Sequence, residues 1–246
     1  MEFLSIPSGA AGLGIHGGRL SMNEERIREM FWYVFAPKKG EHVLFLYDTP
    51  HGKIKDSTIW IDRRKTAEEW YQIFRKIGEE EGLIVDIASY PATGLHNARI
   101  PATITERVKK SNLVIALTEY SASHPIGLVC QSKNSVTRCA SLPLFEKSME
   151  NTAFTADFAL MRKYAKSLEH LLNNSVGADI SFSTDDTLYI DLRNRKACVD
   201  DGICHNTGDL INLPFGEAYK APYEAAGDEV SIFGKSKTHG ILPDYF

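Results

Sequence analysis

Short apolar runs alternate with amphipathic stretches from about residue 40 onward. Four apolar runs predict buried strands, at His42–Asp48, Leu83–Ile87, Leu113–Thr118 and Val136–Leu142. Helical spacing of apolar residues predicts a helix over Thr66–Gly82, a short helix over Ile104–Ser111, and an earlier helix that begins at Ser21 with Glu24 three residues later. Strands that alternate with helices indicate a parallel sheet joined by right-handed crossovers. The pattern therefore predicts a Rossmann-like α/β domain over residues 41–177, after an N-terminal arm and helix in residues 1–40.

The pattern changes after a long predicted helix. Its apolar stripe has the steps of three and four residues expected of core packing, and comprises Phe154, Phe158, Met161, Ala165, Leu168 and Leu172. After Gly177 come short runs separated by Asp-Asp and Gly-Asp turn signals, at residues 179–184, 187–192, 211–213 and 229–233. These runs predict a small antiparallel β element in residues 178–246, which also carries the sequence N-L-P-F-G-E.

Composition narrows the class of protein. The chain has 246 residues, 43% hydrophobic and 24% charged, which is typical of a globular protein. The net charge of −4 and the scattered basic residues argue against nucleic acid or a membrane as partners, and the basic run Arg63–Lys65 is predicted to form a solvated helix face. Because there is neither a long apolar segment nor a signal-like N-terminus, we expect a cytoplasmic protein whose four cysteines are reduced.

Two motifs resemble ligand sites but lack the context that such sites need. Residues Gly12–Gly17 match G-x-G-x-x-G, yet Pro7 interrupts any strand before them and Gly18 follows in place of a helix, so we do not expect a dinucleotide site. Cys198, Cys204 and His205 form a partial metal-ligand set without a second ligand pair, and ordinary thiols beside a turn are the favoured interpretation.

Polar residues follow the third predicted strand, in the sequence T-E-Y-S-A-S-H-P. Ligands bind at the carboxyl ends of parallel strands, so Glu119, Tyr120, Ser121 and His124 are candidates for lining a crevice. An equally weighted alternative is that Ser121 caps the next helix and His124 packs beside it.

Five segments together resemble one family, in the right order and at compatible spacing: N-L-V-I-A-L-T-E-Y-S-A-S-H-P, T-R-C-A-S-L-P, the long predicted helix, D-I-S-F-S and I-N-L-P-F-G-E-A-Y-K-A-P-Y-E. They look like the N-terminal domain shared by thermophilic-type metalloaminopeptidases and 2,5-dihydroxypyridine 5,6-dioxygenases. The resemblance covers residues 41–234 and implies that Glu217 matches a glutamate of the aminopeptidase metal site.

The sequence departs from this family after the N-L-P-F-G-E loop. The resemblance places most of the metal ligands in a following C-terminal domain with a His-x-Asp pair, whereas only His239 follows Tyr223 here. A selective site needs several protein ligands. We therefore expect a truncated member that lacks the C-terminal metal domain, with no cofactor, no catalytic residues and Glu217 as a vestigial ligand position.

The resemblance extends to the peptide-binding proteins of crocagin-type clusters, which make ribosomally synthesised, modified peptides. It implies a non-catalytic, homodimeric protein that holds a precursor or leader peptide. Candidate peptide-binding residues are Tyr120, Ser121, His124, Asn212, Phe215, Glu217 and Tyr219. One alternative is a metal-dependent aminopeptidase or ring-cleaving dioxygenase completed by a second subunit; another is a metabolite-binding module that uses the Gly12–Gly17 loop.

Overall fold

The computed structural model describes residues 24–183, 186–221 and 230–233. The Gly12–Gly17 motif, Ser21 and His239 lie outside these residues. Among the described residues, no helix is both long and apolar enough to cross a membrane.

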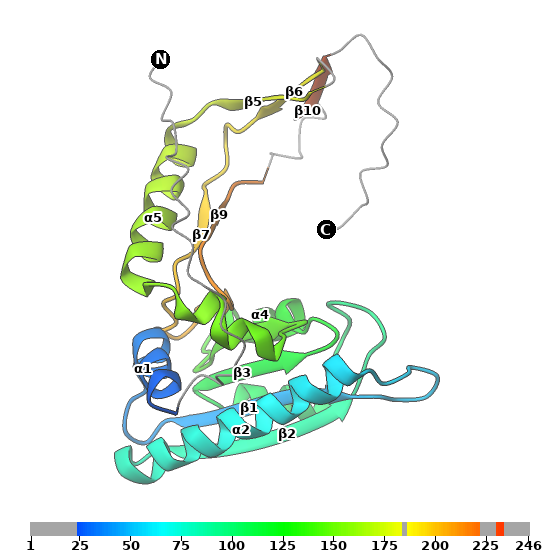
Figure 1. The fold of residues 1–246 in the computed structure, drawn as a ribbon, viewed down its shortest axis with the longest axis vertical. Helices are drawn as coiled ribbons and strands as arrows, with labels where there is room; N and C mark the ends of the chain where they lie inside the picture. Colours follow the sequence, from blue (N-terminus) through cyan, green and yellow to red (C-terminus); the bar gives the residue numbers. More distant parts are fainter. Residues whose placement is uncertain (1–23, 184–185, 222–229, 234–246) are drawn as a thin grey trace, which may run out of the picture.

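A five-stranded parallel sheet forms the centre of the α/β layer (Figure 1), in the order β2-β1-β3-β4-β8. Its strands are β1 (His42–Thr49), β2 (Ile84–Pro91), β3 (Leu113–Thr118), β4 (Arg138–Pro143) and β8 (Leu210–Asn212). The four predicted strands are confirmed. The prediction was wrong for β8, which pairs parallel with β4 instead of joining the antiparallel element. Three residues carry too little pattern to reveal a partner about 70 residues away.

Helices cover both faces of this sheet. On one face lie α1 (Glu24–Phe35) and α2 (Thr58–Glu81); on the other lie α3 (Ala102–Lys109) and α4 (Ser123–Cys130). Helix α2 begins two turns before the predicted start at Thr66, because the Ser57 hydroxyl accepts a hydrogen bond from the Trp60 backbone N–H. It ends as predicted at Gly82, which has φ 75° in the left-handed region.

An aromatic cluster fixes α1 and α2 on the sheet. The Phe31 ring lies 4.8 Å from Phe74, 5.6 Å from Trp70 and 6.5 Å from Phe45, measured between centroids. All four side chains are fully buried. Because burying each one contributes about 1.5–3 kcal/mol, this cluster stabilises the layer that positions the strand ends.

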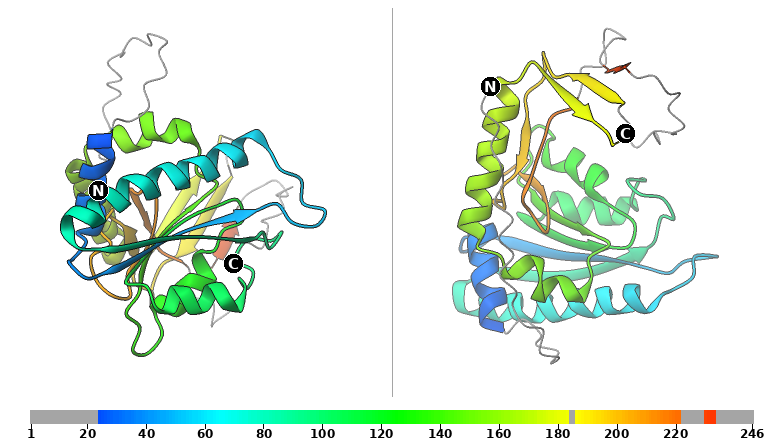
Figure 2. Two further views of the ribbon diagram at one scale, coloured as in Figure 1. Left: turned by 90° about the horizontal axis from the view of Figure 1, so that it is seen from below. Right: turned by 45° about the horizontal axis from the view of Figure 1, so that its top comes forward.

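The chain leaves the sheet after β4 and builds an arm. The turns η1 (Lys147–Asn151) and η2 (Ala153–Thr155) lead into α5 (Phe158–Asn174), which rises from the α/β layer (Figure 1). At its far end β5 (Gly177–Ser181), β6 (Thr187–Asp191) and β10 (Val230–Phe233) form an antiparallel sheet in the order β10-β6-β5. The ribbon of β7 (Cys198–Asp200) and β9 (Glu217–Tyr219) returns beside α5, as Figure 2 shows from two further sides.

The long predicted helix differs from the structure in two respects. It is interrupted after Phe154, and α5 starts anew where the Asp157 side chain accepts from the Leu160 backbone N–H. Its stripe is also not uniformly core. Phe158 and Ala165 are buried, whereas Leu168 is 49% exposed, so the prediction of core packing was wrong for Leu168.

Candidate functional site

The sheet reverses its winding between β1 and β3, and open α/β sheets bind ligands at that point. Here the position is taken by the carboxylate of Asp48, at the end of β1. It accepts hydrogen bonds from the backbone N–H of Glu119 at 2.8 Å, from that of Tyr120 at 2.9 Å and from the Trp60 indole at 3.0 Å. Burial raises the pKa of Asp48, and these donors act against that rise. The chain's own side chain therefore uses the donors that an anionic ligand would need.

Glu119 is likewise engaged within the protein. Its carboxylate forms an ion pair with Arg63, whose Nε donates to the carbonyl of Phe145 at 2.6 Å. The Arg63 side chain is 2% exposed. The prediction of a solvated face over Arg63–Lys65 was thus wrong for Arg63, because a partner from a distant loop can neutralise and bury a helical arginine.

A cluster of small polar side chains lies at the carboxyl edge, where β3, β4 and β8 end. The Ser123 hydroxyl oxygen is 3.0 Å from Ser121 Oγ, 2.8 Å from Ser141 Oγ and 3.2 Å from Asn212 Oδ1. We call these four residues the edge cluster. Two of its members were predicted site residues, Ser121 and Asn212, and the structure brings them together from positions 91 residues apart. Ser123 and Ser141 were missed, although a serine near the end of an apolar strand is a signal for Ser141.

Polar side chains of Asn97 and Ser121 support the start of α4. The Asn97 side-chain oxygen accepts from the His124 backbone N–H and from the Ser121 hydroxyl, both at 3.1 Å. The Ser121 hydroxyl oxygen also lies 3.3 Å from the Ser123 backbone N–H. Ser121 thus supports the helix start and belongs to the edge cluster at once. The His124 side chain is exposed and lines a cavity.

Tyr120 is held between two rings of the same edge. Its ring centroid lies 6.2 Å from Trp60 and 5.7 Å from His96. Tyr120 and Ser121 lie on the loop after β3, His124 lies in the first turn of α4, and Asn212 ends β8, so all four are at one edge of the sheet.

The three other predicted residues lie at the foot of the arm. Phe215 packs on Phe158 with 5.2 Å between ring centroids, and its ring covers Gly202, where a Cβ atom would come within 2.7 Å of it. Gly202 has φ 79°, so both space and conformation require glycine there. Glu217 and Tyr219 lie on β9, opposite β7. Partial burial, then the nearby Cys198, raises the pKa of Tyr219 to about 12.

The acidic groups around Glu217 do not suit a metal ion. Asp200, its partner in the β7–β9 register, accepts the Asn212 backbone N–H at 3.2 Å, and burial raises the pKa of Asp200. Asp201 pairs with Arg162 at 3.1 Å and with Lys166 at 3.5 Å. Over the described ranges, no group of three or more histidine, cysteine, aspartate or glutamate side chains could hold a metal. The metal that the family resemblance implies for Glu217 therefore does not fit this part of the chain.

Cys198, Cys204 and His205 are not brought together as a ligand set. Cys198 is exposed, whereas Cys204 is fully buried and burial raises the pKa of its thiol. The His205 ring lies 3.0 Å from the carbonyl oxygen of Tyr33. The three residues thus have separate surroundings.

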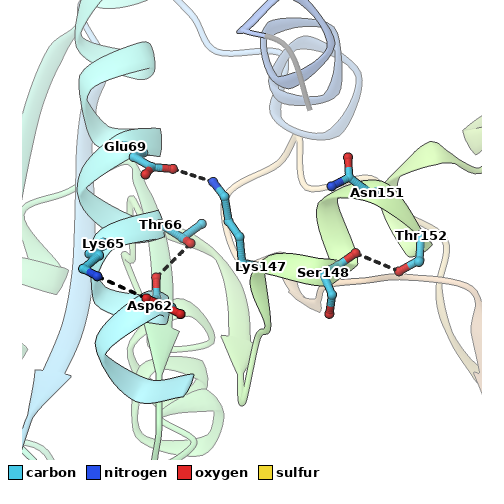
Figure 3. Close-up of a pocket in the computed structure, with 8 residues that line it drawn as sticks. All are labelled: Asp62, Lys65, Thr66, Glu69, Lys147, Ser148, Asn151 and Thr152. Atoms are coloured by element: carbon cyan, nitrogen blue, oxygen red, sulfur yellow. Dashed lines mark hydrogen bonds and ion pairs between the residues drawn. The ribbon is translucent and has the colours of Figure 1, made fainter. Parts of the chain in front are cut away.

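A cavity of 630 Å³ lies between α2 and η1 (Figure 3). Its charged side chains are already paired: Lys65 with Asp62 at 3.2 Å, and Lys147 with Glu69. Lys147 also contacts the buried carboxylate of Glu150, at 2.9 Å. The Lys147–Glu69 pair joins η1 to α2, which gives the cavity a structural role.

Comparison with known proteins supports the fold. No protein-family model matches the chain, and no curated protein matches its sequence. Among solved structures, the 2,5-dihydroxypyridine dioxygenase from Pseudomonas putida KT2440 superposes with a TM-score of 0.56 at 13% identity. The match covers 80% of this chain and 55% of the dioxygenase, so the chain spans about half the length of that enzyme. The α/β fold is confirmed, and the two proteins share a distant structural relationship.

Proposed function

We propose that this protein is a non-catalytic peptide-binding protein that holds a precursor peptide during the biosynthesis of a ribosomally made, modified peptide. The observation that carries the proposal is the outer edge of β5. Within the described residues β5 pairs with β6 alone, so its second row of backbone donors and acceptors has no strand beside it. An extended peptide that adds as a strand satisfies these groups.

The edge of β5 is less protected than the two edges of the five-stranded sheet. Its sequence, G-A-D-I-S, contains neither proline nor lysine. In contrast, the edge strand β2 ends at Pro91 and carries Asp86, which pairs with His42 at 2.9 Å. The edge strand β8 has three residues, and the N–H of Asn212 is already bonded to Asp200. A proline and a very short edge strand both limit strand addition, so β5 is a better template than β2 or β8.

Apolar side chains lie on one face of the β5–β6 pair. The register places Ala178 opposite Ile190 and Ile180 opposite Leu188, with side chains on the same face. Ile180 is 39% exposed and Phe182, directly after β5, is 50% exposed. Every second side chain of an added peptide strand would pack on these apolar side chains and bury them. This burial adds affinity to that of the backbone hydrogen bonds.

The absence of catalysis is the second part of the proposal. It is supported by the chemistry around Glu217, where the neighbouring carboxylates are bonded to backbone N–H groups and cations of the same protein. The alternative of a dioxygenase or aminopeptidase completed by a second subunit has its support in the shared fold alone. The homodimer and the cytoplasmic location stay predictions.

The backbone of β5 allows a sharp test of strand addition. Phe182 donates its N–H to Asp186 O, and Val176 O accepts from Leu192 N, so even-numbered residues direct their backbone groups toward β6. By alternation, the N–H groups of Asp179 and Ser181 point outward. Asp179→Pro removes one outward donor without breaking a β5–β6 bond, whereas Asp179→Ala removes the side chain and keeps the donor.

We expect Asp179→Pro to weaken binding about threefold to tenfold, the equivalent of one backbone hydrogen bond, and Asp179→Ala to leave it nearly unchanged. Calorimetry with the peptide most strongly retained from a random decapeptide pool measures both. If the two variants bind that peptide equally well, strand addition at β5 is excluded.

A further inference from the structure

A half-open pocket with a volume of 400 Å³ lies between α3 and α4 and the loop that follows β2. Three charged or titratable side chains line it, Arg99, Lys109 and His124, and no carboxylate does. The volume is at the small end of the range for ligand sites, about 300–1,000 Å³, which suits the end of a chain better than a large cofactor.

Arg99 gives this pocket its anion preference. Lys109 is paired with Glu106 at 2.8 Å, whereas no described carboxylate pairs with Arg99, whose side chain is exposed. A guanidinium without a described carboxylate partner, in a pocket that an imidazole also lines, offers planar, bidentate recognition of a carboxylate.

The remaining wall of the pocket is apolar. Ile100 and Val129 form buried parts of it, and Leu128 on α4 is 58% exposed at its rim. An apolar side chain of a ligand bound here would cover Leu128. The Arg99 guanidinium and the apolar wall together therefore select a ligand with an apolar group next to a carboxylate.

Asn97 connects this pocket to the edge cluster. It lines the pocket, and its side-chain oxygen accepts from Ser121 of the edge cluster and from the His124 backbone. A ligand that occupies the pocket thus adjoins the polar groups at the ends of β3, β4 and β8.

We propose that the α3–α4 pocket binds the C-terminal carboxylate of a peptide together with its apolar last side chain. This inference rests on the proposed peptide-binding function, because a small apolar carboxylic acid offers the pocket the same two groups as the C-terminal residue of a peptide. It assigns direction to the bound peptide, since only one end of a peptide has the group that Arg99 recognises.

The test compares two forms of one peptide pool. Random decapeptides are prepared as free acids and as C-terminal amides, mixed in equal amounts, incubated with the full chain and identified by mass spectrometry after retention. We expect the free acids to be enriched about tenfold over the amides, as for a charge-assisted hydrogen bond, with leucine, valine or phenylalanine at the last position.

Two variants locate the effect. In Arg99→Gln the acid-to-amide ratio should fall close to one, whereas Arg75→Gln, a control at an exposed arginine on α2, should keep it. Leu128→Ser should remove the preference for an apolar last residue and leave the acid preference in place.

The outcomes separate this inference from the proposed function. A ratio near one in the wild-type protein, with peptides retained, overturns the carboxylate site and leaves peptide binding standing. If no peptide is retained, both fail. Binding of N-acetyl-leucine in calorimetry without retention of any peptide overturns the peptide assignment.

Discussion

Glu41 and Arg138 show how single residues join separate parts of the fold. Two nitrogens of Arg138, on β4, lie 2.8 Å from the two carboxylate oxygens of Glu41, and the Arg138 side chain is 3% exposed. Arg138 also donates to the carbonyl of Cys204, before β8, and to that of Phe35, at the end of α1. The pair therefore holds three segments at the amino end of the sheet.

Replacing Glu41 with glutamine should lower the free energy of unfolding by about 2–4 kcal/mol, because Arg138 stays buried with no opposing charge. Burial raises the pKa of Glu41, but the hydrogen bonds from Arg138 and from the Lys38 N–H outweigh it, so the pKa is lowered. A lowered pKa gives stability that is present above the unfolded value of about 4.3 and is lost as the pH falls through the folded value.

Urea denaturation between about pH 5.5 and pH 3.5 should thus show a shallower pH dependence in Glu41→Gln than in the wild type. Glu79→Gln, at an exposed pair with Arg75, is the control and should change stability by less than about 0.5 kcal/mol. Equal stability and equal pH dependence in Glu41→Gln and the wild type would contradict the structural role of the pair.

At the scale of elements, α5 shows where periodicity misleads. Helix α5 packs against the β7–β9 ribbon, and its Ala165 is 2% exposed, whereas Leu168, one turn on in the same predicted stripe, is half exposed. The reason is the width of the covering element: a two-stranded ribbon covers a narrower arc of a helix than a sheet does.

Ala165→Glu should therefore destabilise the protein by more than about 3 kcal/mol, because it buries a charge without a partner. Leu168→Glu should cost less than about 1 kcal/mol. Both values come from urea denaturation at neutral pH. Similar losses in the two variants would show that the whole stripe is core, as its spacing alone suggests.

The elements that could be predicted are those whose pattern is local. Strands β1, β2, β3 and β4 follow from apolar runs, and Gly82 marks the end of α2. Strand β8 and the burial of Arg63 depend on partners far along the chain, which no local pattern contains. For the candidate site, the position after β3 was predictable from the rule for strand ends, whereas the contacts of Ser123 and Ser141 were not.

At the scale of the whole molecule, an α/β layer is combined with an arm that places a second, antiparallel sheet away from it (Figure 1). The layer is well packed. The Asp48 carboxylate occupies the point between β1 and β3 where the sheet reverses its winding. The surfaces that stay available to a binding partner lie at the margins of the molecule. They are the outer edge of β5, the edge cluster and the α3–α4 pocket. Surfaces of this kind suit an extended partner better than a small substrate enclosed in a crevice.

The central claim is that the protein holds a peptide and leaves it chemically unchanged. The most direct measurement is mass spectrometry of a free-acid decapeptide pool after incubation with the full chain in the presence of Zn²⁺ and Fe²⁺. We predict that a subset of peptides is retained with unaltered masses. Retained or released peptides shortened by their first residue, at a rate that depends on Glu217, would contradict the claim and establish an aminopeptidase.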